Sequence, residues 1–334
     1  MRRHRHRLGF DSHQQITMGG RIMINCISIL MRRNAMLGLA VLVVILASVA
    51  MGQDKDAPAA KAKEAAKPAP LTITWVKNIL TIHGEHLPEK EVKIWYLEAY
   101  CRPGSTDRVW NETVIGHKTE LVSANEAKTE VKLRCTLSDG VVVDHTITAG
   151  KDEIDFRVVA RNPTDKPSLA HWAQPCIRVG NFTGFNDPKK KYDYIKKSFI
   201  FLDGKLELMP TRDWATEARY IPGQVWRPAN VPADDVNPRP LNKHHPSNGL
   251  IGCFSGDNKM ILANAWEPYQ ELFQGVIICI HNDFRIGGLK PGESKKVRGK
   301  LYLVPNDVKA LLARYQKDFP EQVVKSKPDK AKPR

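Results

Sequence analysis

The chain has 334 residues, of which 42% are hydrophobic and 26% charged, and its formal net charge is +15. This balance excludes a wholly disordered chain and a collagen-like one, and the length allows one large or two small domains. Residues 1–52 contain seven Arg and one Asp, which leaves about +9 for the remainder. A basic domain favours acidic partners, namely nucleic acid, anionic lipid or acidic polysaccharide.

The N-terminal segment predicts export. Residues 31–34 (MRRN) are positively charged, residues 35–50 are almost entirely apolar, and small residues at 50 and 52 precede a cleavage point before Gln53. The apolar run is short for a bilayer span, which favours a cleaved signal and no stable membrane span afterwards. We therefore expect translation from Met31 and an extracytoplasmic protein, either periplasmic, secreted or in the cell envelope. Export also argues against nucleic acid as the partner.

Composition divides the chain into four parts. Residues 1–52 are the N-terminal extension and signal peptide, and residues 53–70 form an Ala/Lys/Pro linker with too little apolar surface to fold. Residues 322–334 are a basic Lys/Pro-rich tail. Residues 71–321 remain for one folded domain.

The folded part reads as strands joined by turns. Asp139-Gly140 and Asp203-Gly204 each lie between apolar arms, which is typical of tight β-hairpins. A third hairpin is predicted between residues 250–254 and 260–263, and other strands are predicted at 131–137, 154–160, 276–280 and 297–304.

One helix is predicted near the end of the chain. Asn306 or Asp307 caps it, apolar residues recur at helical spacing from Val308 to Tyr315, and Pro320 ends it. We therefore predict an all-β fold, a large antiparallel β-sandwich with one short C-terminal helix. The Pro-rich stretch 210–248 is long for a loop within a compact domain, and its tryptophans favour a functional role over disorder.

Five cysteines follow the signal segment, with wide spacing and no C-x-x-C motif. They are Cys101, Cys135, Cys176, Cys253 and Cys279. Disulfides and buried thiols both stay open as interpretations, and a zinc knuckle is not predicted.

Gly-x-Ser-x-Gly, Walker-type and dinucleotide-binding loops are absent from the sequence. We therefore expect no cofactor and assign no metal ligand.

The order of strands and turns resembles the galactose-mutarotase-like (aldose-epimerase-like) supersandwich family over roughly residues 71–305. The segments that support the resemblance are Ile94-Trp95-Tyr96-Leu97-Glu98, Asp139-Gly140, Asp155-Phe156-Arg157 with Asn162-Pro163, and Pro291-Gly292-Glu293. The Asn-His-x-x-x-Phe type of segment associated with aldose epimerases is absent. The resemblance implies a fold that faces sugars and leaves the reaction open.

Two clusters are candidates for catalysis. His281 and Asp283 follow the predicted strand 276–280, and in a sugar site His281 would be the general acid with Asp283 as its orienting partner. Glu267 is the candidate base, beside Trp266, whose ring would stack on a sugar. The alternatives are a capped surface turn for the first cluster and ordinary packing for Trp266.

Four further residues are candidates for ligand binding. Trp226, His244 and His245 lie in the long loop, where the histidines would contact an anionic ligand, bind a metal together with further ligands, or simply belong to a polar loop. Arg178 suits a carboxylate or sulfate, with a structural ion pair as its alternative.

Two functions therefore remain from the sequence. The first is an exported carbohydrate-binding or carbohydrate-active sandwich that acts on acidic glycans by acid–base chemistry. The alternative is a non-catalytic cell-envelope protein that binds a protein or a surface polymer, with the basic tail adding salt-sensitive attachment.

Overall fold

The computed structural model describes residues 69–104, 109–190, 192–215, 223–237, 240–275 and 277–322. The predicted signal peptide, nearly all of the linker and the basic tail after Gln322 lie outside these residues, as do Arg239 and Val276. No helix of the described residues is long and apolar enough to cross a membrane.

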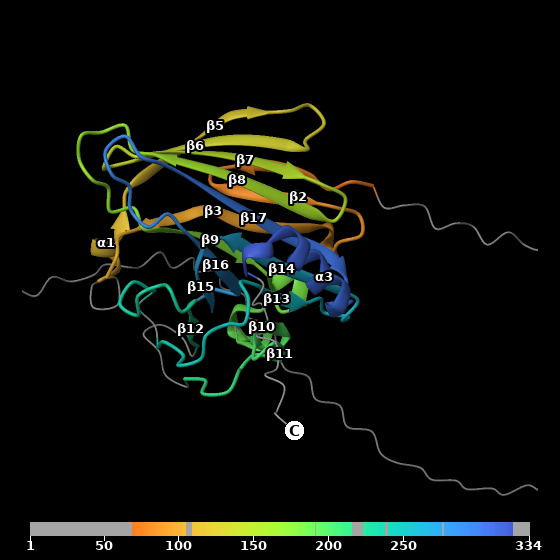
Figure 1. Ribbon diagram of the computed structural model, residues 1–334. Helices are drawn as coiled ribbons and strands as arrows, with labels where there is room; N and C mark the ends of the chain where they lie inside the picture. The colour runs from red at the N-terminus through yellow and green to blue at the C-terminus, as the bar shows by residue number, and fades with distance from the viewer. Residues whose placement is uncertain are drawn as a thin grey trace, which may run out of the picture. The chain divides into compact units, whose positions relative to one another are not determined.

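Two antiparallel sheets make up the described domain, which confirms the predicted all-β sandwich (Figure 1). Sheet A has the strand order β1-β2-β3-β9-β16-β15-β12, and β4 pairs with β3. Its strands are β1 (Thr72–Val76), β2 (Ile79–His83), β3 (Glu91–Cys101), β4 (Val114–Ile115), β9 (Trp172–Arg178), β12 (Val225–Trp226), β15 (Tyr269–Gln274) and β16 (Cys279–Arg285).

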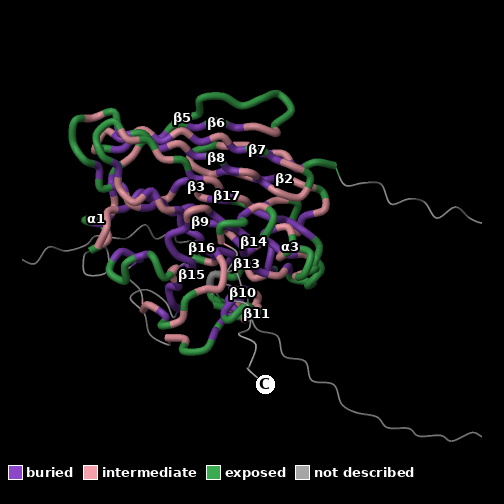
Figure 2. Tube along the Cα trace, viewed as in Figure 1, coloured by how far each residue is buried: buried purple, intermediate pink, exposed green. Residues whose placement is uncertain are grey.

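Sheet B has the strand order β11-β10-β13-β14-β17-β8-β7-β6-β5. Most residues of its edge strand β5 are exposed, and they appear green in Figure 2. The strands are β5 (His117–Ala124), β6 (Glu130–Leu137), β7 (Val142–Ala149), β8 (Glu153–Arg161), β10 (Ser198–Leu202), β11 (Lys205–Leu208), β13 (Ile251–Phe254), β14 (Met260–Glu267) and β17 (Ser294–Pro305).

The three predicted hairpins form as expected. Asp203 and Gly204 both have positive φ, 49° and 76°, and they join β10 to β11 with Leu202 opposite Lys205. This is the backbone that a two-residue hairpin turn requires and that Asp-Gly adopts readily. Asp139-Gly140 joins β6 to β7, and residues 255–259 join β13 to β14.

The main core lies between the two sheets. Alternate residues of each strand point inward, so Ile94 of sheet A and Phe156 of sheet B belong to the same buried cluster. A second cluster lies on the outer face of sheet B, where α3 (Val308–Asp318) packs Leu311 and Tyr315 against it. Asp307 caps α3 by accepting a hydrogen bond from the amide of Ala310, as the sequence predicted.

The other helices are single turns. They are η1 (Pro88–Lys90), α1 (Trp110–Thr113), α2 (Gly180–Thr183), η2 (Pro188–Lys190), η3 (Asp193–Lys197) and η4 (Pro320–Gln322).

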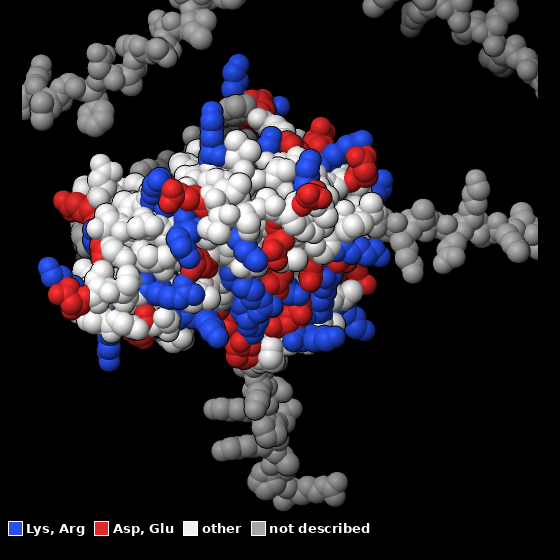
Figure 3. Space-filling model, turned by 90° about the horizontal axis from the view of Figure 1, so that it is seen from above, with Lys and Arg blue, Asp and Glu red and all other residues white. Residues whose placement is uncertain are grey.

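Charged side chains of both signs are mixed on the surface. Arg134 and Arg161 both pair with Asp144, and Lys300 pairs with Glu153, all on strands of sheet B. Figure 3 shows the same mixture of basic and acidic groups on the face seen from above. On that face, the positive charge of the chain is therefore not gathered into one uniform patch.

Candidate functional site

The centre of sheet A presents a row of reactive side chains on its outer face. In β16, Ile280 and Phe284 point into the core between the sheets. Successive side chains of a strand point to opposite faces, so Cys279, His281 and Asp283 point away from that core. The sequence had placed His281 and Asp283 after a strand at 276–280. The structure corrects this, because β16 begins at Cys279 and Ile277 before it is 54% exposed.

His281 lies at the middle of this row. Its Nε2 is 3.5 Å from the sulfur of Cys279 and 4.0 Å from Oε2 of Glu98, and its Nδ1 is 3.6 Å from Oδ1 of Asp283. The ring stacks on Phe273 with 4.4 Å between centroids and 6° between planes. Only 3% of the His281 side chain is exposed. Packing therefore fixes the direction in which each ring nitrogen points.

Burial and neighbouring charges shift the pKa values of these groups. Burial raises the pKa of Asp283 to about 7 against the pull of His281, and it raises that of Glu271 well above its ordinary value, helped by Asp283. Burial alone would lower the pKa of His281, but the charges of Cys279 and Asp283 raise it to about 10. Burial alone would raise the pKa of Cys279, but the hydrogen bond from Cys176 and the charge of His281 hold it well below the ordinary value. The groups of this cluster thus shift one another's pKa values, because they lie close together and are buried.

Several buried polar atoms around His281 have no hydrogen-bond partner among the described residues. They are Nδ1 of His281, both carboxylate oxygens of Asp283, Oε1 of Glu271 and Oε1 of Gln174. An unsatisfied buried polar group costs about 1–3 kcal/mol, so several together on one face need an explanation. A polar or cationic ligand bound on this face would give these atoms their missing partners.

The loop after β12 crosses beside the same face. Asp235 accepts hydrogen bonds from Arg285 at 2.9 Å and pairs with Nδ1 of His171 at 3.1 Å. The amide of Asn237 donates to Glu271 at 2.8 Å. These contacts attach the loop to strands β15 and β16, and they hold it next to Glu271.

Glu98 is the member of the cluster that reaches solvent, since 23% of its side chain is exposed. It lies where the register between β3 and β9 shifts, between Trp95 and Ala99. Such bulges redirect side chains and are frequent next to functional sites. The amide of Gln174 donates to Glu98 at 3.4 Å.

Arg178 and Trp95 lie on the same face of sheet A as Cys176, because Trp95 is opposite Cys176 in the register and Arg178 follows Cys176 by two residues. The Arg178 guanidinium lies 5.8 Å from the centre of the Trp95 ring, and both side chains are half-buried. Among the described residues, no carboxylate lies within ion-pair distance of Arg178. The alternative interpretation of Arg178 as part of a structural ion pair is therefore not supported. The predicted ligand residue Arg178 lies opposite Cys279 in the register of β9 and β16, two residues along β16 from His281.

Glu267 and Trp266 do not join this cluster. Trp266 is fully buried between the sheets, with ring centroids 5.1 Å from Phe156 and 4.7 Å from Phe284. It is a core residue and offers no face to a sugar. Glu267 lies on sheet B, where it accepts a hydrogen bond from Gln322. The sequence placed both after a strand, whereas β14 continues through Glu267.

The loop residues are also separate from the His281 cluster. Trp226 is fully buried, with its ring centroid 5.7 Å from that of Trp214. His244 pairs with Asp213 at 2.8 Å, and Nδ1 of His245 bonds to the carbonyl of Arg227 at 2.9 Å. Each histidine therefore has a partner within the loop itself.

Sequence reasoning missed Glu98, Glu271 and the two cysteines of this face. Cys279-x-His281-x-Asp283 was an available signal, because alternate residues of a strand share a face. The cysteines Cys101, Cys135, Cys176, Cys253 and Cys279 are all buried and free. Of the two interpretations left open for them, the structure therefore has buried thiols.

No family model and no curated protein sequence matches this chain. The Slr1438 protein from Synechocystis sp. PCC 6803 is similar in structure, with a TM-score of 0.42 and 8% identity, over 71% of this chain and 95% of that one. A galactose mutarotase-like protein from Lactobacillus casei has a TM-score of 0.37 and 8% identity, over 70% and 99%. A galactose mutarotase related enzyme from Lactobacillus acidophilus has a TM-score of 0.34 and 8% identity, over 70% and 97%.

Proposed function

We propose that this chain binds a carbohydrate on the outer face of sheet A and catalyses proton transfer on it through Glu98. The observation that supports this most directly is the position of Glu98. Its side chain is half-buried at a bulge in β3, and its Oε2 lies 4.0 Å from Nε2 of His281. A carboxylate that is partly exposed and lies next to an imidazole fixed by packing is suited to exchange a proton with a sugar hydroxyl.

The proposed chemistry needs no co-reactant. The Glu98 carboxylate takes the proton of the anomeric hydroxyl while the bond between the anomeric carbon and the ring oxygen breaks. The protonated carboxyl then returns that proton to the former ring oxygen, and the sugar can close on either face. His281 is a positioning residue here, because its side chain is almost fully buried and it would act on the sugar only through Glu98.

We further propose that the sugar carries an acidic group. Arg178 is the cation on the rim of the site, and a guanidinium binds carboxylate or sulfate in a bidentate manner. Trp95 beside it would stack on the apolar C–H face of the same sugar. A uronate or a sulfated glycan therefore fits this rim better than a neutral sugar.

The compartment is part of the proposal. The basic and apolar residues 31–52 support export, so the substrate would be a glycan outside the cytoplasm. Mass spectrometry of the protein from its native cells tests this. A mature N-terminus at or near Gln53 is expected, and an N-terminus at Met1 or Met31 would contradict export with cleavage.

Binding is tested by thermal unfolding of the full chain with neutral sugars, uronates and sulfated glycans. At a hundredfold excess over the dissociation constant, a ligand of the folded state adds about 2.7 kcal/mol of stability. We expect stabilisation by acidic sugars and its loss in Arg178→Leu. Absence of stabilisation by every glycan would overturn the proposal and favour the non-catalytic envelope protein.

Catalysis is tested by the rate at which a bound sugar interconverts its anomers, measured by NMR. Glu98→Gln is expected to lower this rate by about 10²- to 10⁴-fold while binding persists. Glu267→Gln is the matched control, since it removes a carboxylate on the other sheet and should leave the rate unchanged. Equal rates for wild type and Glu98→Gln would show that Glu98 is not the catalytic group.

A further inference from the structure

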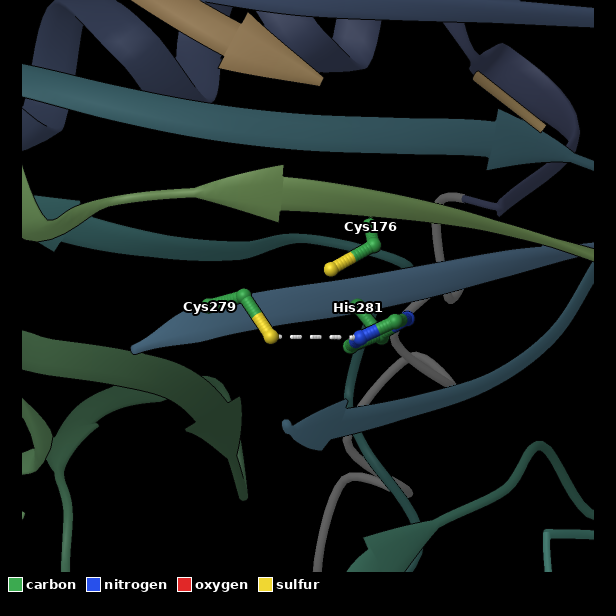
Figure 4. Close-up of side chains that lie close together, drawn as sticks. All are labelled: Cys176, Cys279 and His281. Carbon is green, nitrogen blue, oxygen red and sulfur yellow. Dashed lines mark hydrogen bonds between the residues drawn. The ribbon is translucent and has the colours of Figure 1, made fainter. Parts of the chain in front are cut away.

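Two thiols and an imidazole converge beneath Glu98, and the proposed proton transfer makes no use of the thiols. Cys176 on β9 lies opposite His281 on β16 in the strand register, and Cys279 precedes His281 by two residues on the same face. The two sulfurs and a ring nitrogen of His281 all lie within 4.8 Å of one another. Figure 4 shows the three side chains directed toward a common point. All three residues are buried.

The distance between the Cys279 sulfur and the His281 ring nitrogen matches a tetrahedral zinc site, and the Cys176 sulfur lies within 4.8 Å of both. With Zn–S of about 2.3 Å and Zn–N of about 2.0 Å, tetrahedral ligands place sulfur and nitrogen about 3.5 Å apart. The measured distance from the Cys279 sulfur to Nε2 of His281 is 3.5 Å. Thiolate and imidazole are also the ligands that zinc prefers, and hard ions such as Mg²⁺ prefer oxygen.

The surroundings of His281 suit a metal ligand as well. A metal-bound histidine usually donates its other ring N–H to a carboxylate, which fixes the ring. Nδ1 of His281 is buried, has no hydrogen-bond partner among the described residues, and points to Asp283 at 3.6 Å. Stacking on Phe273 holds the ring in this orientation.

Gly275 closes one side of the cluster. A Cβ atom at this position would lie 2.1 Å from the Cys279 sulfur and 3.0 Å from Nε2 of His281. The backbone therefore passes directly over the pair, and only glycine leaves room for it. Glu98, 4.0 Å from Nε2, stands on the side that reaches solvent.

We propose that Cys176, Cys279 and His281 bind one zinc ion, with the fourth position open beside Glu98. Three protein ligands and one open position are typical of catalytic rather than structural zinc sites. The ion would bring positive charge beneath Glu98 and the bound sugar. Zinc binding does not depend on the carbohydrate proposal, and it can be tested by itself.

The test uses the full chain, reduced and freed of metal by a chelator, and titrated with Zn²⁺ alone in a calorimeter. One equivalent is expected to bind. Cys176→Ser and Cys279→Ser should each weaken binding by more than about 100-fold, and Asp283→Asn by about 10- to 100-fold. Cys253→Ser is the matched control, because Cys253 is buried on β13 away from these ligands, and it should bind like wild type.

A second measurement uses only the wild-type chain, so its result does not depend on whether the variants fold. Co²⁺ added to the wild-type chain should produce a thiolate-to-metal charge-transfer band that Zn²⁺ removes. Absence of that band, unchanged zinc affinity in Cys176→Ser, or a Cys176–Cys279 disulfide found by mass spectrometry of the native protein would each overturn the proposal. If zinc does not bind but acidic sugars still stabilise the chain, only the zinc proposal is wrong. If zinc binds but no glycan stabilises the chain, only the carbohydrate proposal is wrong.

Discussion

The most specific prediction on stability concerns His145, a histidine buried in the main core. Nδ1 of its ring lies 2.8 Å from the hydroxyl of Tyr96, and Nε2 lies 3.0 Å from that of Tyr100. The neutral ring has one donor and one acceptor, so one tyrosine donates to it and the other accepts from it. A protonated ring has two donors and would carry its charge in an apolar core. Burial accordingly lowers the pKa of His145 to about 3.

The sign and size of the effect follow from linkage. The unfolded chain takes up a proton on His145 below its ordinary pKa of 6.5, and the folded protein does so only near pH 3. The contribution of His145 to the free energy of unfolding is therefore constant above pH 6.5, and it falls as the pH is lowered from there toward 3. At pH 5, one and a half units below 6.5, the loss is about 2 kcal/mol at 1.36 kcal/mol per unit.

Urea unfolding at pH 8 and pH 5 measures this loss. His145→Gln keeps one donor and one acceptor between the two tyrosines but cannot titrate. We expect wild type to lose about 2 kcal/mol more than the variant between these pH values. Tyr100→Phe should lower stability at both pH values and keep the wild-type difference. Equal losses in wild type and His145→Gln would refute the reasoning, because they would mean that His145 is not held neutral by the fold.

Three further predictions concern packing and capping, and all are checked by urea unfolding at neutral pH. Trp266→Ala should cost about 3–5 kcal/mol, because its ring fills the core between the sheets, and it should leave carbohydrate binding unchanged. Sugar binding lost in a folded Trp266→Ala protein would contradict its placement in the core. Asp307→Ala should cost about 1 kcal/mol through loss of the cap to the amide of Ala310, and an unchanged midpoint would show that this bond contributes nothing. Gly275→Ala should cost about 1–3 kcal/mol by forcing a methyl group against the sulfur of Cys279, and wild-type stability in this variant would contradict the close approach of the backbone to that sulfur.

The sequence predicted those parts of the fold that depend on neighbouring residues. The Asp203-Gly204 turn and the cap at Asp307 are local devices, and each formed at the predicted position. The start of β16 was misplaced because residues 276–280 form an apolar run, which by itself does not show where strand pairing begins. The pairing of β16 with β9 and β15 decides the boundary instead.

The candidate site was harder to predict for the same reason. Cys176 and Cys279 meet because β9 and β16 are neighbours, and pairing between strands so far apart along the chain leaves no local pattern. Glu98 enters the site through a bulge in β3 that alternation alone does not reveal. Glu267 and Trp266 looked equally suitable in sequence, but both belong to β14 of sheet B, where Trp266 points into the core and Glu267 points to the opposite face.

The place of β17 in sheet B has a consequence for how the protein must be made. This strand is the last of the described strands in the sequence, yet it lies between β14 and β8 and joins the two halves of the sheet. In a chain that ends before residue 294, β14 and β8 lack their common partner, so each would present an unpaired edge. Such edges invite pairing with other chains. The larger sheet can therefore be completed only after the chain has been synthesised through β17.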